Sequence, residues 1–315
     1  MKERSDLGAA SPDIDAVVTV YNPEDILLAL CRELVAQARY VFIVDDGSSA
    51  PTADSLLHEC EKLGCIVVRH PSNLGVAAAL NTGVSTALGQ VPRPAGIITL
   101  DQDSELPAGY IASLVEASET ASAAGFSVGM VAPEFIGGLP SHTREKRGDV
   151  VLGNEPIQSG LLIPTVVFDE IGIFLEQLFI DAVDTEYYLR ASSSGLHVVV
   201  AVGVALGHSL GNRYFPQFLG RRLRVRGRDF GLVRSAPFRY YYIARNHITM
   251  VRIYGRKFPG WAARETLLDL RHFLILLVLV PERKLHLRMI TAGWRDGFAG
   301  VGGRIPADLV GPRVF

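Results

Sequence analysis

The stretch Ile97-Ile98-Thr99-Leu100-Asp101-Gln102-Asp103-Ser104 joins an apolar run to two carboxylates that are one residue apart. Aliphatic and β-branched residues in such a run are typical of a buried strand. Ligands of open α/β sheets bind at the carboxyl ends of strands, and alternate side chains of an extended segment share one face. We therefore expect Asp101 and Asp103 to bind one ligand. A divalent cation that also binds substrate phosphates suits them best. A solvated turn after the strand is the alternative.

The composition is that of an ordinary globular protein. The 315 residues are 48% hydrophobic and 20% charged, enough for one large α/β domain or for a domain with an appendage. A net charge of −2 does not indicate a protein that binds nucleic acid through its overall charge. The polar stretch from Met1 to Ser11 lacks the apolar segment of a secretory signal. The apolar run from Phe273 to Val280 is far shorter than the ~20 residues that cross a bilayer.

The chain holds three cysteines, Cys31, Cys60 and Cys65. They are too few, and odd in number, for a disulfide framework. His58 and His70 lie nearby, but the spacing matches no standard zinc site. We therefore expect reduced thiols in a cytoplasmic protein.

Strands and helices alternate regularly in the first half of the sequence. Runs of aliphatic and β-branched residues predict strands at residues 15–22, 40–44, 65–68 and 97–100. Helical spacing of apolar residues, or runs of small residues, predict helices at residues 23–38, 52–63 and 76–84. This alternation is typical of an α/β fold with a mostly parallel, doubly wound sheet.

The pattern loosens after residue 125. The sequence predicts a helix at 187–194, a mobile polar loop at 137–150, and strands at 128–133, 157–163 and 197–200. Beyond residue 212 the chain becomes basic and aromatic, and then helical from 261 to 280. We therefore expect an α/β domain in residues 1–212 and a helical C-terminal extension in residues 213–315.

Four strand ends carry acidic or polar residues, namely Asn22, Asp45-Asp46, Asp101 with Asp103, and the segment 181–186. Four such ends in one parallel sheet indicate a shared cleft. Neither a Gly-x-Gly-x-x-Gly nor a Gly-x-x-x-x-Gly-Lys-Ser/Thr phosphate loop is present. A nucleotide bound in this cleft would rely on a metal at Asp103 to neutralise its diphosphate.

A series of short motifs, spread over roughly residues 15–250, resembles the family 2 glycosyltransferases of the GT-A fold, and specifically their bacterial rhamnosyltransferase branch. The motifs are Val20-Tyr21-Asn22-Pro23, Val44-Asp45-Asp46-Gly47-Ser48, Asn73-Leu74-Gly75, Asn81-Thr82-Gly83, Leu100-Asp101-Gln102-Asp103-Ser104, Gln158-Ser159-Gly160, Asp181-Ala182-Val183-Asp184-Thr185-Glu186-Tyr187-Tyr188-Leu189-Arg190, Gly207-His208-Ser209-Leu210-Gly211 and Tyr241-Tyr242-Ile243-Ala244-Arg245-Asn246. Their order is more specific than any one of them. The resemblance implies a GT-A fold for residues 1–212.

The resemblance also implies a nucleotide-sugar site and a divalent cation, Mg²⁺ or Mn²⁺. The implied donor-binding residues are Tyr21, Asn22, Asp45, Asp46, Asn73, Gly75, Asn81, Asp101, Gln102, Ser159 and Gly160. Asp103 would bind the metal, and His208 would complete the metal or diphosphate site. From the residues alone, a turn at Asp46-Gly47 is an alternative to nucleotide binding. With equal weight, Tyr21 can be a partly buried strand aromatic, Gly75 can serve helix–sheet packing and His208 can be structural.

The implied reaction is an inverting displacement at the anomeric carbon of the donor sugar, with a transition state of oxocarbenium character. By the motif that ends at Arg190, the general base is Asp184. Many relatives carry Glu-Asp where this chain has Val183-Asp184, so the base is kept and one carboxylate is lost. Asp181 and Glu186 are rivals, and Asp184 can instead cap the helix that begins there.

In the rhamnosyltransferase branch the donor is usually dTDP-β-L-rhamnose, and the acceptor is commonly a lipid-linked glycan at the cytoplasmic membrane face. The Gln-x-x-Arg-Trp signature of processive synthases is absent, which favours transfer of one or a few sugars. The basic runs 221–228 and 283–288 suit a peripheral contact with a membrane, and packing with solvation is the alternative. Dimerisation through the C-terminal helices is a third role that the residues leave open.

The same residues bear on other possible functions. A glycosyltransferase that uses another UDP, GDP or dTDP sugar keeps every motif. A non-catalytic nucleotide-sugar or glycan-binding module would lose the carboxylate pair or the base, and both are present. A nucleotidylyltransferase needs a Gly-rich basic loop that residues 17–23 lack, and a dehydrogenase needs the missing glycine fingerprint.

Overall fold

The computed structural model describes residues 13–207, 213–215, 217–218, 221–222, 224–225, 227–229 and 231–310. His208, a predicted metal ligand, lies outside these residues. The chain divides into two compact units. Of the described residues, those up to Phe174 and those from Tyr187 to Gly207 form the first unit. Residues 175–186 and those from Arg213 onward form the second.

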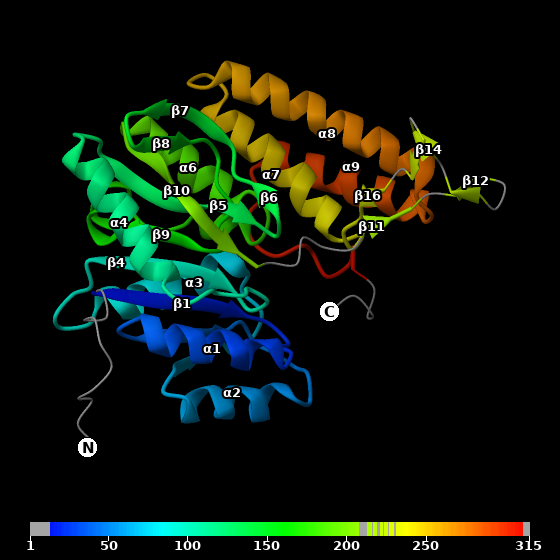
Figure 1. Ribbon diagram of the computed structural model, residues 1–315. Helices are drawn as coiled ribbons and strands as arrows, with labels where there is room; N and C mark the ends of the chain where they lie inside the picture. Colours follow the sequence, from blue (N-terminus) through cyan, green and yellow to red (C-terminus); the bar gives the residue numbers. More distant parts are fainter. Residues whose placement is uncertain are drawn as a thin grey trace. The chain divides into compact units, whose positions relative to one another are not determined.

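The first unit is built on a ten-stranded sheet in the order β3-β2-β1-β4-β9-β5-β10-β8-β7, with β6 paired to β5 (Figure 1). The strands are β1 (Ile14–Val20), β2 (Val41–Asp45), β3 (Ile66–Arg69), β4 (Gly96–Asp101), β5 (Val128–Ile136), β6 (Leu139–Pro140), β7 (Thr143–Arg147), β8 (Val150–Gly153), β9 (Leu161–Pro164) and β10 (His197–Leu206). The helices are α1 (Ile26–Gln37), α2 (Ala53–Lys62), α3 (Val76–Leu88), α4 (Tyr110–Ala123) and α5 (Thr165–Ile171). Helix α6 (Val183–Ser193) begins in residues of the second unit and ends in the first.

The sheet is mostly parallel, as predicted. Strands β3, β2, β1 and β4 run parallel to one another, and β10 is parallel to β5. Strand β9 is antiparallel to both of its neighbours. Because β1 lies between β2 and β4, the strand order reverses at β1. A topological switch point of this kind is where open α/β sheets form their ligand crevice.

Helices cover both faces of the sheet at β1. Successive side chains of a strand point to opposite faces, so β1 packs against one helix on each face. Ala16 and Val18 belong to the hydrophobic cluster that includes Leu27 of α1. Val17 points to the other face, where a Cβ on Gly83 of α3 would lie 2.3 Å from its Cγ1 atom. The small residues predicted in this helix therefore serve close packing of α3 on β1, and the sheet is doubly wound.

Two predictions for the middle of the first unit were wrong in detail. Residues 137–150 are not a loop: they form β6, β7 and the first residue of β8, and β7 pairs antiparallel with β8. Every residue of β7 is exposed, so this edge strand has no buried face to produce an apolar alternation. The strand predicted at 157–163 begins only at Leu161.

The second unit is helical, as predicted for the C-terminal extension. Its helices are the 3₁₀ helix η1 (Glu176–Leu178), α7 (Arg239–Tyr254), α8 (Pro259–Leu279) and α9 (Arg283–Ala299). Two-residue strands form three small antiparallel pairs, β11 (Arg213–Tyr214) with β16 (Leu232–Val233), β12 (Gln217–Phe218) with β13 (Arg221–Arg222), and β14 (Arg224–Val225) with β15 (Arg228–Asp229). The core of this unit buries the aromatic run Tyr240, Tyr241 and Tyr242 together with aliphatic residues of α8 and α9.

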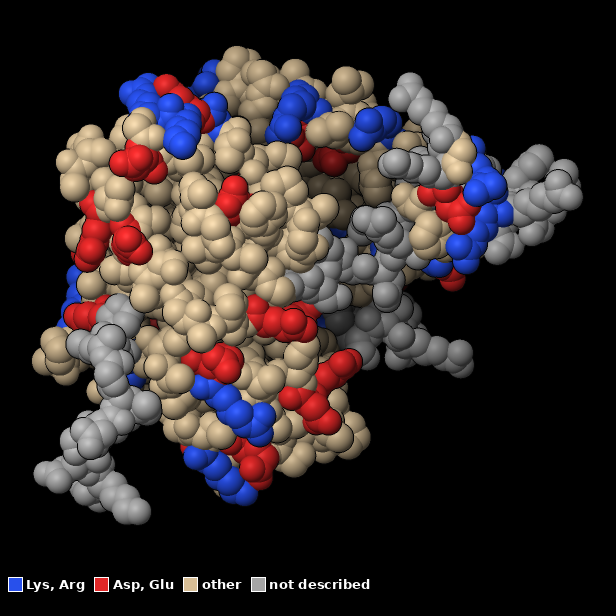
Figure 2. Space-filling view, in the orientation of Figure 1, with Lys and Arg blue, Asp and Glu red and all other residues tan. Residues whose placement is uncertain are grey.

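Charges of both signs are scattered over the visible face of the first unit, as Figure 2 shows. This mixture agrees with a net charge of −2. Over the described stretches of the chain, no helix has the length and apolar character needed to span a bilayer. The apolar run at the end of α8 is divided: Phe273 and Leu276 are buried, whereas Leu274 and Val278 are exposed.

Candidate functional site

The two carboxylates of the Asp101–Asp103 turn lie at the carboxyl end of β4, beside β1. Asp101 is the last residue of β4 and pairs in register with Thr19 of β1. Gln102 links the two strand ends, because its Oε1 accepts a hydrogen bond from the Tyr21 N–H (2.8 Å) and its Nε2 donates to the Tyr21 carbonyl (3.2 Å). The predicted residues Tyr21, Gln102 and Asp101 are thus brought together at the switch point.

Ser159 holds the same turn from the side of β9. Its hydroxyl oxygen accepts a hydrogen bond from the Asp101 N–H (3.1 Å) and lies 2.7 Å from the hydroxyl of Ser104. The Gly160 N–H donates to the Thr99 carbonyl at 2.7 Å. Ser159 and Gly160 therefore shape the strand end that carries the carboxylates. Direct contact of either with a donor stays a prediction.

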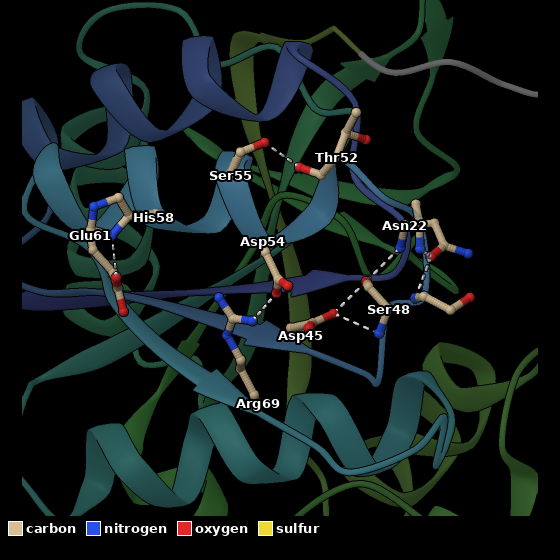
Figure 3. A network of polar contacts seen from close by, with 11 residues as sticks. Asn22, Asp45, Ser48, Thr52, Asp54, Ser55, His58, Glu61 and Arg69 are labelled. Carbon is tan, nitrogen blue, oxygen red and sulfur yellow. Dashed lines mark hydrogen bonds and ion pairs between the residues drawn. The ribbon is translucent and has the colours of Figure 1, made fainter.

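Asn22, Ser48 and Asp45 connect the ends of β1 and β2 (Figure 3). The Oδ1 atom of Asp45 accepts hydrogen bonds from the N–H (3.1 Å) and hydroxyl of Ser48, whose Oγ accepts from the Asn22 N–H (2.7 Å). The Asn22 side-chain oxygen accepts from the N–H groups of Ser49 and Ala50, both at 2.9 Å. Asn22 itself has a φ of 48°, so this network fixes a backbone conformation that is uncommon outside glycine.

Asp46 organises the loop between β3 and α3. Its two carboxylate oxygens accept the N–H groups of Leu74 and Gly75, each at 2.8 Å, and Oδ1 also lies 2.8 Å from Nδ1 of His70. A Cβ on Gly47, whose φ is 73°, would lie 2.4 Å from a backbone carbon of this loop. The geometry gives Asp46 a structural task, but through contacts with a distant loop and not through the local turn at Asp46-Gly47 that was the alternative. Donor binding by Asp46 stays a prediction.

The asparagines predicted near the donor differ in their surroundings. Both side-chain atoms of Asn81 bond to the backbone of Phe174, at 2.8 and 2.9 Å, which fixes the chain after α5. By contrast, Asn73 Oδ1 and Gln158 Nε2 are buried and have no hydrogen-bond partner within the part of the chain that the structure describes. Buried polar atoms are normally paired, so these two are candidates for ligand contact. Gln158 was not singled out as a site residue, although its place beside Ser159 was a signal.

Asp103, with Asp101 beside it, is the predicted metal ligand of this strand end. Both side chains are half-buried, and they are one residue apart in the sequence at the end of β4. In the ranges described, no three or more His, Cys, Asp and Glu side chains form a group that could hold a metal ion. A hard cation that takes its remaining ligands from water and substrate phosphates, as Mg²⁺ does, stays a prediction for this strand end.

Asp184 lies in the second unit, in the first turn of α6. Its Oδ1 accepts a hydrogen bond from the Thr185 N–H at 2.9 Å. Its two rivals have other partners: Asp181 forms an ion pair with Arg239, and buried Glu186 accepts a hydrogen bond from the Tyr254 hydroxyl at 2.6 Å. Each of the three carboxylates therefore has a partner, and the role of Asp184 as general base stays a prediction.

Comparison with known proteins connects these features to one enzyme class. Residues 15–157 match the family model described as Glycosyl transferase family 2. The chain is 29% identical over 318 residues to the dTDP-rhamnosyl transferase RfbF of Shigella flexneri, covering 94% of this chain and 99% of that protein. It is also 33% identical over 115 residues, 34% of this chain and 33% of the relative, to an undecaprenyl-phosphate 4-deoxy-4-formamido-L-arabinose transferase of Serratia proteamaculans.

Among solved structures, TarS of S. aureus shares the fold. The match has a TM-score of 0.50 and 11% sequence identity, and it covers 92% of this chain. The chain spans 44% of the length of that TarS chain. At this identity the likeness concerns the fold alone.

Proposed function

Given that this chain carries a Glycosyl transferase family 2 domain over residues 15–157 and is a glycosyltransferase, we propose that it transfers L-rhamnose from dTDP-L-rhamnose to a hydroxyl of a glycan acceptor. The observation that carries the choice of donor is the similarity to a dTDP-rhamnosyl transferase along 94% of this chain. The strand-end carboxylates and the buried unpaired atoms of Asn73 and Gln158 support a polar, phosphate-bearing ligand at the same sheet edge.

In the proposed mechanism, Asp103 would bind Mg²⁺ or Mn²⁺ beside the donor-binding Asp101, and His208, which lies outside the described residues, would complete the metal or diphosphate site. When bound, the cation stabilises the charge that develops on the departing diphosphate. Asp45 accepts hydrogen bonds from the nucleoside, and the ring of Tyr21 packs on the base. Asp184 removes the proton of the acceptor hydroxyl as this oxygen attacks the anomeric carbon from the opposite face.

The donor is tested by binding and turnover across a panel of dTDP, UDP and GDP sugars, with Mg²⁺, with Mn²⁺ and with EDTA. Asp103→Ala is expected to weaken metal-dependent donor binding roughly 100-fold. Asp184→Asn is expected to keep donor binding and to lower kcat by about 10²–10⁴-fold. The matched control is Glu105→Ala, which removes an exposed carboxylate two residues after Asp103.

The panel separates the alternatives. Selective turnover of a UDP or GDP sugar would keep the glycosyltransferase and reject rhamnose as the transferred sugar. Metal-dependent binding without turnover on any acceptor would indicate a non-catalytic nucleotide-sugar module. Equal loss of binding in Asp103→Ala and in Glu105→Ala would reject Asp103 as the metal ligand.

We also propose that the acceptor is lipid-linked and that α8 contacts an anionic membrane surface at the cytoplasmic face. One face of α8 is exposed and apolar, with exposed fractions of 70, 51, 64 and 53% at Leu267, Leu270, Leu274 and Val278. Residues three or four positions apart on a helix share one face. An apolar stripe of this kind lies in the membrane interface when the helix also carries basic residues.

The charges around this stripe favour anionic lipid. Arg264 and Arg271 are exposed on α8, and Arg283 and Lys284 are exposed at the start of α9. None of the acidic residues of α8 is exposed. A second copy of the same face would bring arginines against arginines, which disfavours pairing of two such helices.

Vesicle sedimentation tests this contact. The wild-type protein is expected to bind vesicles that contain anionic phospholipid and not vesicles of zwitterionic lipid. Leu267→Glu combined with Leu274→Glu is expected to abolish this binding. Val166→Glu with Val202→Glu, at exposed apolar residues of the first unit, is the control. A dimer that the α8 variants dissociate, without vesicle binding by the wild type, would identify a second copy as the partner of α8.

A further inference from the structure

The segment that leads into α6 follows an unusual backbone path. Phe179, Asp181 and Ala182 have φ values of 64°, 63° and 61°, which non-glycine residues rarely adopt. At Phe179 the ψ is −66°, and the Ile180 N–H bonds to the Leu178 carbonyl at 2.7 Å. This is a γ-turn of positive φ, a rare and strained form. The strained stretch ends two residues before Asp184.

Strained conformations persist only when their surroundings over-determine them. Here Asn246 of α7 supplies the main contacts. Its Nδ2 atom donates to the carbonyl oxygens of Leu178, Ile180 and Asp181, at 3.0, 2.8 and 2.8 Å. An amide has two N–H bonds, so at least one of them is shared between two carbonyl groups. Asn246 is itself almost fully buried, so bulk solvent does not compete for these bonds in the folded protein.

Arg245 orients this amide. Its Nε donates to Asn246 Oδ1 at 2.9 Å, which turns the Nδ2 atom toward the carbonyl groups. The Arg245 guanidinium also donates to the carbonyls of Gln177 (3.0 Å), Leu178 (2.7 Å) and Gly303. Its carbon Cζ lies 5.0 Å from the centre of the Tyr242 ring. Within the described residues no carboxylate pairs with this buried guanidinium, so its charge is matched by backbone carbonyl groups.

Further contacts come from the same face of α7. The Phe179 ring stacks on the Tyr242 ring, with centroids 5.0 Å apart and planes at 5°. Arg239 forms an ion pair with Asp181, and Tyr254 bonds to Glu186. Residues 239, 242, 246 and 254 recur at helical spacing, so this one face holds the whole segment from Phe179 to Glu186.

We propose that Asn246, oriented by Arg245, is a positioning residue for Asp184: it fixes the strained path of residues 178–182 and so sets where the carboxylate of Asp184 stands. The inference rests on the proposed role of Asp184 as the general base. Small displacements of a catalytic group cost on the order of 100-fold in rate. Asn246 touches neither donor nor acceptor in this account and acts only through the segment.

Two variants and one control test the inference in the full-length protein. Asn246→Ala removes the amide, and Asn246→Asp keeps its shape but places an oxygen against three carbonyl oxygens. Both are expected to increase hydrogen exchange of peptides that cover residues 178–184. Both are also expected to lower kcat on the order of 100-fold while the Kd for dTDP changes less than about 2-fold. Arg252→Ala is the control, because Arg252 also lies on α7 but donates to the carbonyls of Gly297 and Phe298.

A double-mutant cycle separates positioning from a general structural role. In an Asp184→Asn background, Asn246→Ala is expected to lower the residual kcat by less than about 3-fold, because the group it positions is already disabled. A full loss in that background, or exchange at 178–184 no greater than in Arg252→Ala, would overturn the inference. If the Asn246 variants fail to fold, Arg245→Lys replaces them. This variant loses the planar guanidinium that orients Asn246, so it is also expected to lower kcat, by a smaller factor.

Failure of the proposed function gives a different result. It appears as a wild-type protein without glycosyl transfer, whereas hydrogen exchange still reports whether Asn246 holds the segment. Transfer by the wild type together with an unchanged kcat in Asn246→Ala would keep the function and reject the positioning role.

Discussion

Both units hold irregular backbone segments with hydrogen bonds from side chains, but the side chains accept these bonds in the first unit and donate them in the second. In the first unit, side-chain oxygens of Asn22, Asp45 and Asp46 accept hydrogen bonds from backbone N–H groups of the loops that follow β2 and β3. In the second unit, side-chain nitrogens of Arg245 and Asn246 donate to backbone carbonyl groups of η1 and of the segment that joins η1 to α6.

For Asp46 and Arg245, the polarity of the contact matches the end of the helix that each side chain serves. A loop that enters a helix has unpaired N–H groups, and Asp46 accepts those of Leu74 and Gly75 directly before α3. A helix that ends has unpaired carbonyl groups, and Arg245 donates to those of η1. The first network therefore adds carboxylates to the strand ends. An Asp→Asn change in the first unit would remove acceptors from its network, and an Asn→Asp change in the second unit would remove donors from its network.

Loss of the Asp46 carboxylate is expected to have the largest effect. Asp46→Ala leaves the N–H groups of Leu74 and Gly75 without their acceptor, and each unsatisfied buried group costs about 1–3 kcal/mol. We expect the free energy of unfolding of the first unit to fall by about 3 kcal/mol. Urea unfolding followed by far-UV circular dichroism measures this change.

The control for Asp46→Ala is Asp54→Asn. Asp54 is an exposed carboxylate on α2 that forms an ion pair with Arg69 (Figure 3). Exposed pairs of this kind contribute within about 1 kcal/mol. If the two variants had equal stability, the Asp46 carboxylate would not be holding the β3–α3 loop, and the contrast between the units would disappear.

The sequence predicted most of the fold in the first unit because its central strands and helices are buried with regular periods. Strand β4 and the Asp101–Asp103 turn lie where the apolar run ends, and the sheet order brings Tyr21 and Asp45 to the same edge. Strand β7 escaped prediction because both of its faces are solvated. A period of two appears in a sequence only when one face is buried.

The contacts of the second unit could not be read from the sequence. The motif that ends in Arg245-Asn246 was recognised, but its partners are backbone carbonyl groups about 65 residues earlier in the chain, and a backbone group carries no sequence signal. The same applies to Asp46 and Asn81, which were expected near the donor and bond to the backbone of Gly75 and Phe174. Residue type revealed the chemistry of these side chains, and only the structure revealed their partners.

A smaller effect is expected from Tyr254→Phe, which tests the second unit alone. The variant removes the hydroxyl that donates to buried Glu186 at 2.6 Å. Hydrogen bonds to charged groups contribute about 1.5–3 kcal/mol, so we expect a loss of about 2 kcal/mol. Trp261 and Trp294 are the two tryptophans of the chain and both lie in the second unit, so tryptophan fluorescence follows its unfolding.

The Kd for dTDP in Tyr254→Phe shows whether the contact between Tyr254 and Glu186 in the second unit affects nucleotide binding. We expect it to match the wild-type value, because the predicted nucleotide contacts belong to the first unit. A Kd raised as much as in Asp103→Ala would show that the contacts of Glu186 support donor binding, and the division of roles between the units would be wrong.

The smallest effect is expected from pH. Burial lowers the pKa of His272 and of His286 in the second unit, and Nε2 of His286 has no hydrogen-bond partner within the described residues. Of the neighbouring charges, Asp269 raises the pKa of His272 and Arg271 lowers it. In the same way, Glu282 raises the pKa of His286 and Arg234 lowers it. Because the unfolded chain binds more protons than the folded one below the ordinary pKa of about 6.5, stability falls as the pH drops below that value.

Thermal unfolding followed by tryptophan fluorescence between pH 5 and 8 measures this loss. We expect the Tm to decrease by a few degrees, about 3 °C, from pH 7 to pH 5.5. His286→Phe keeps an aromatic ring against Tyr240, whose ring centroid lies 5.2 Å away, and should remove part of the pH dependence. A pH profile that is the same in this variant would assign the effect to other groups, because a ring that cannot bind a proton cannot contribute to the linkage.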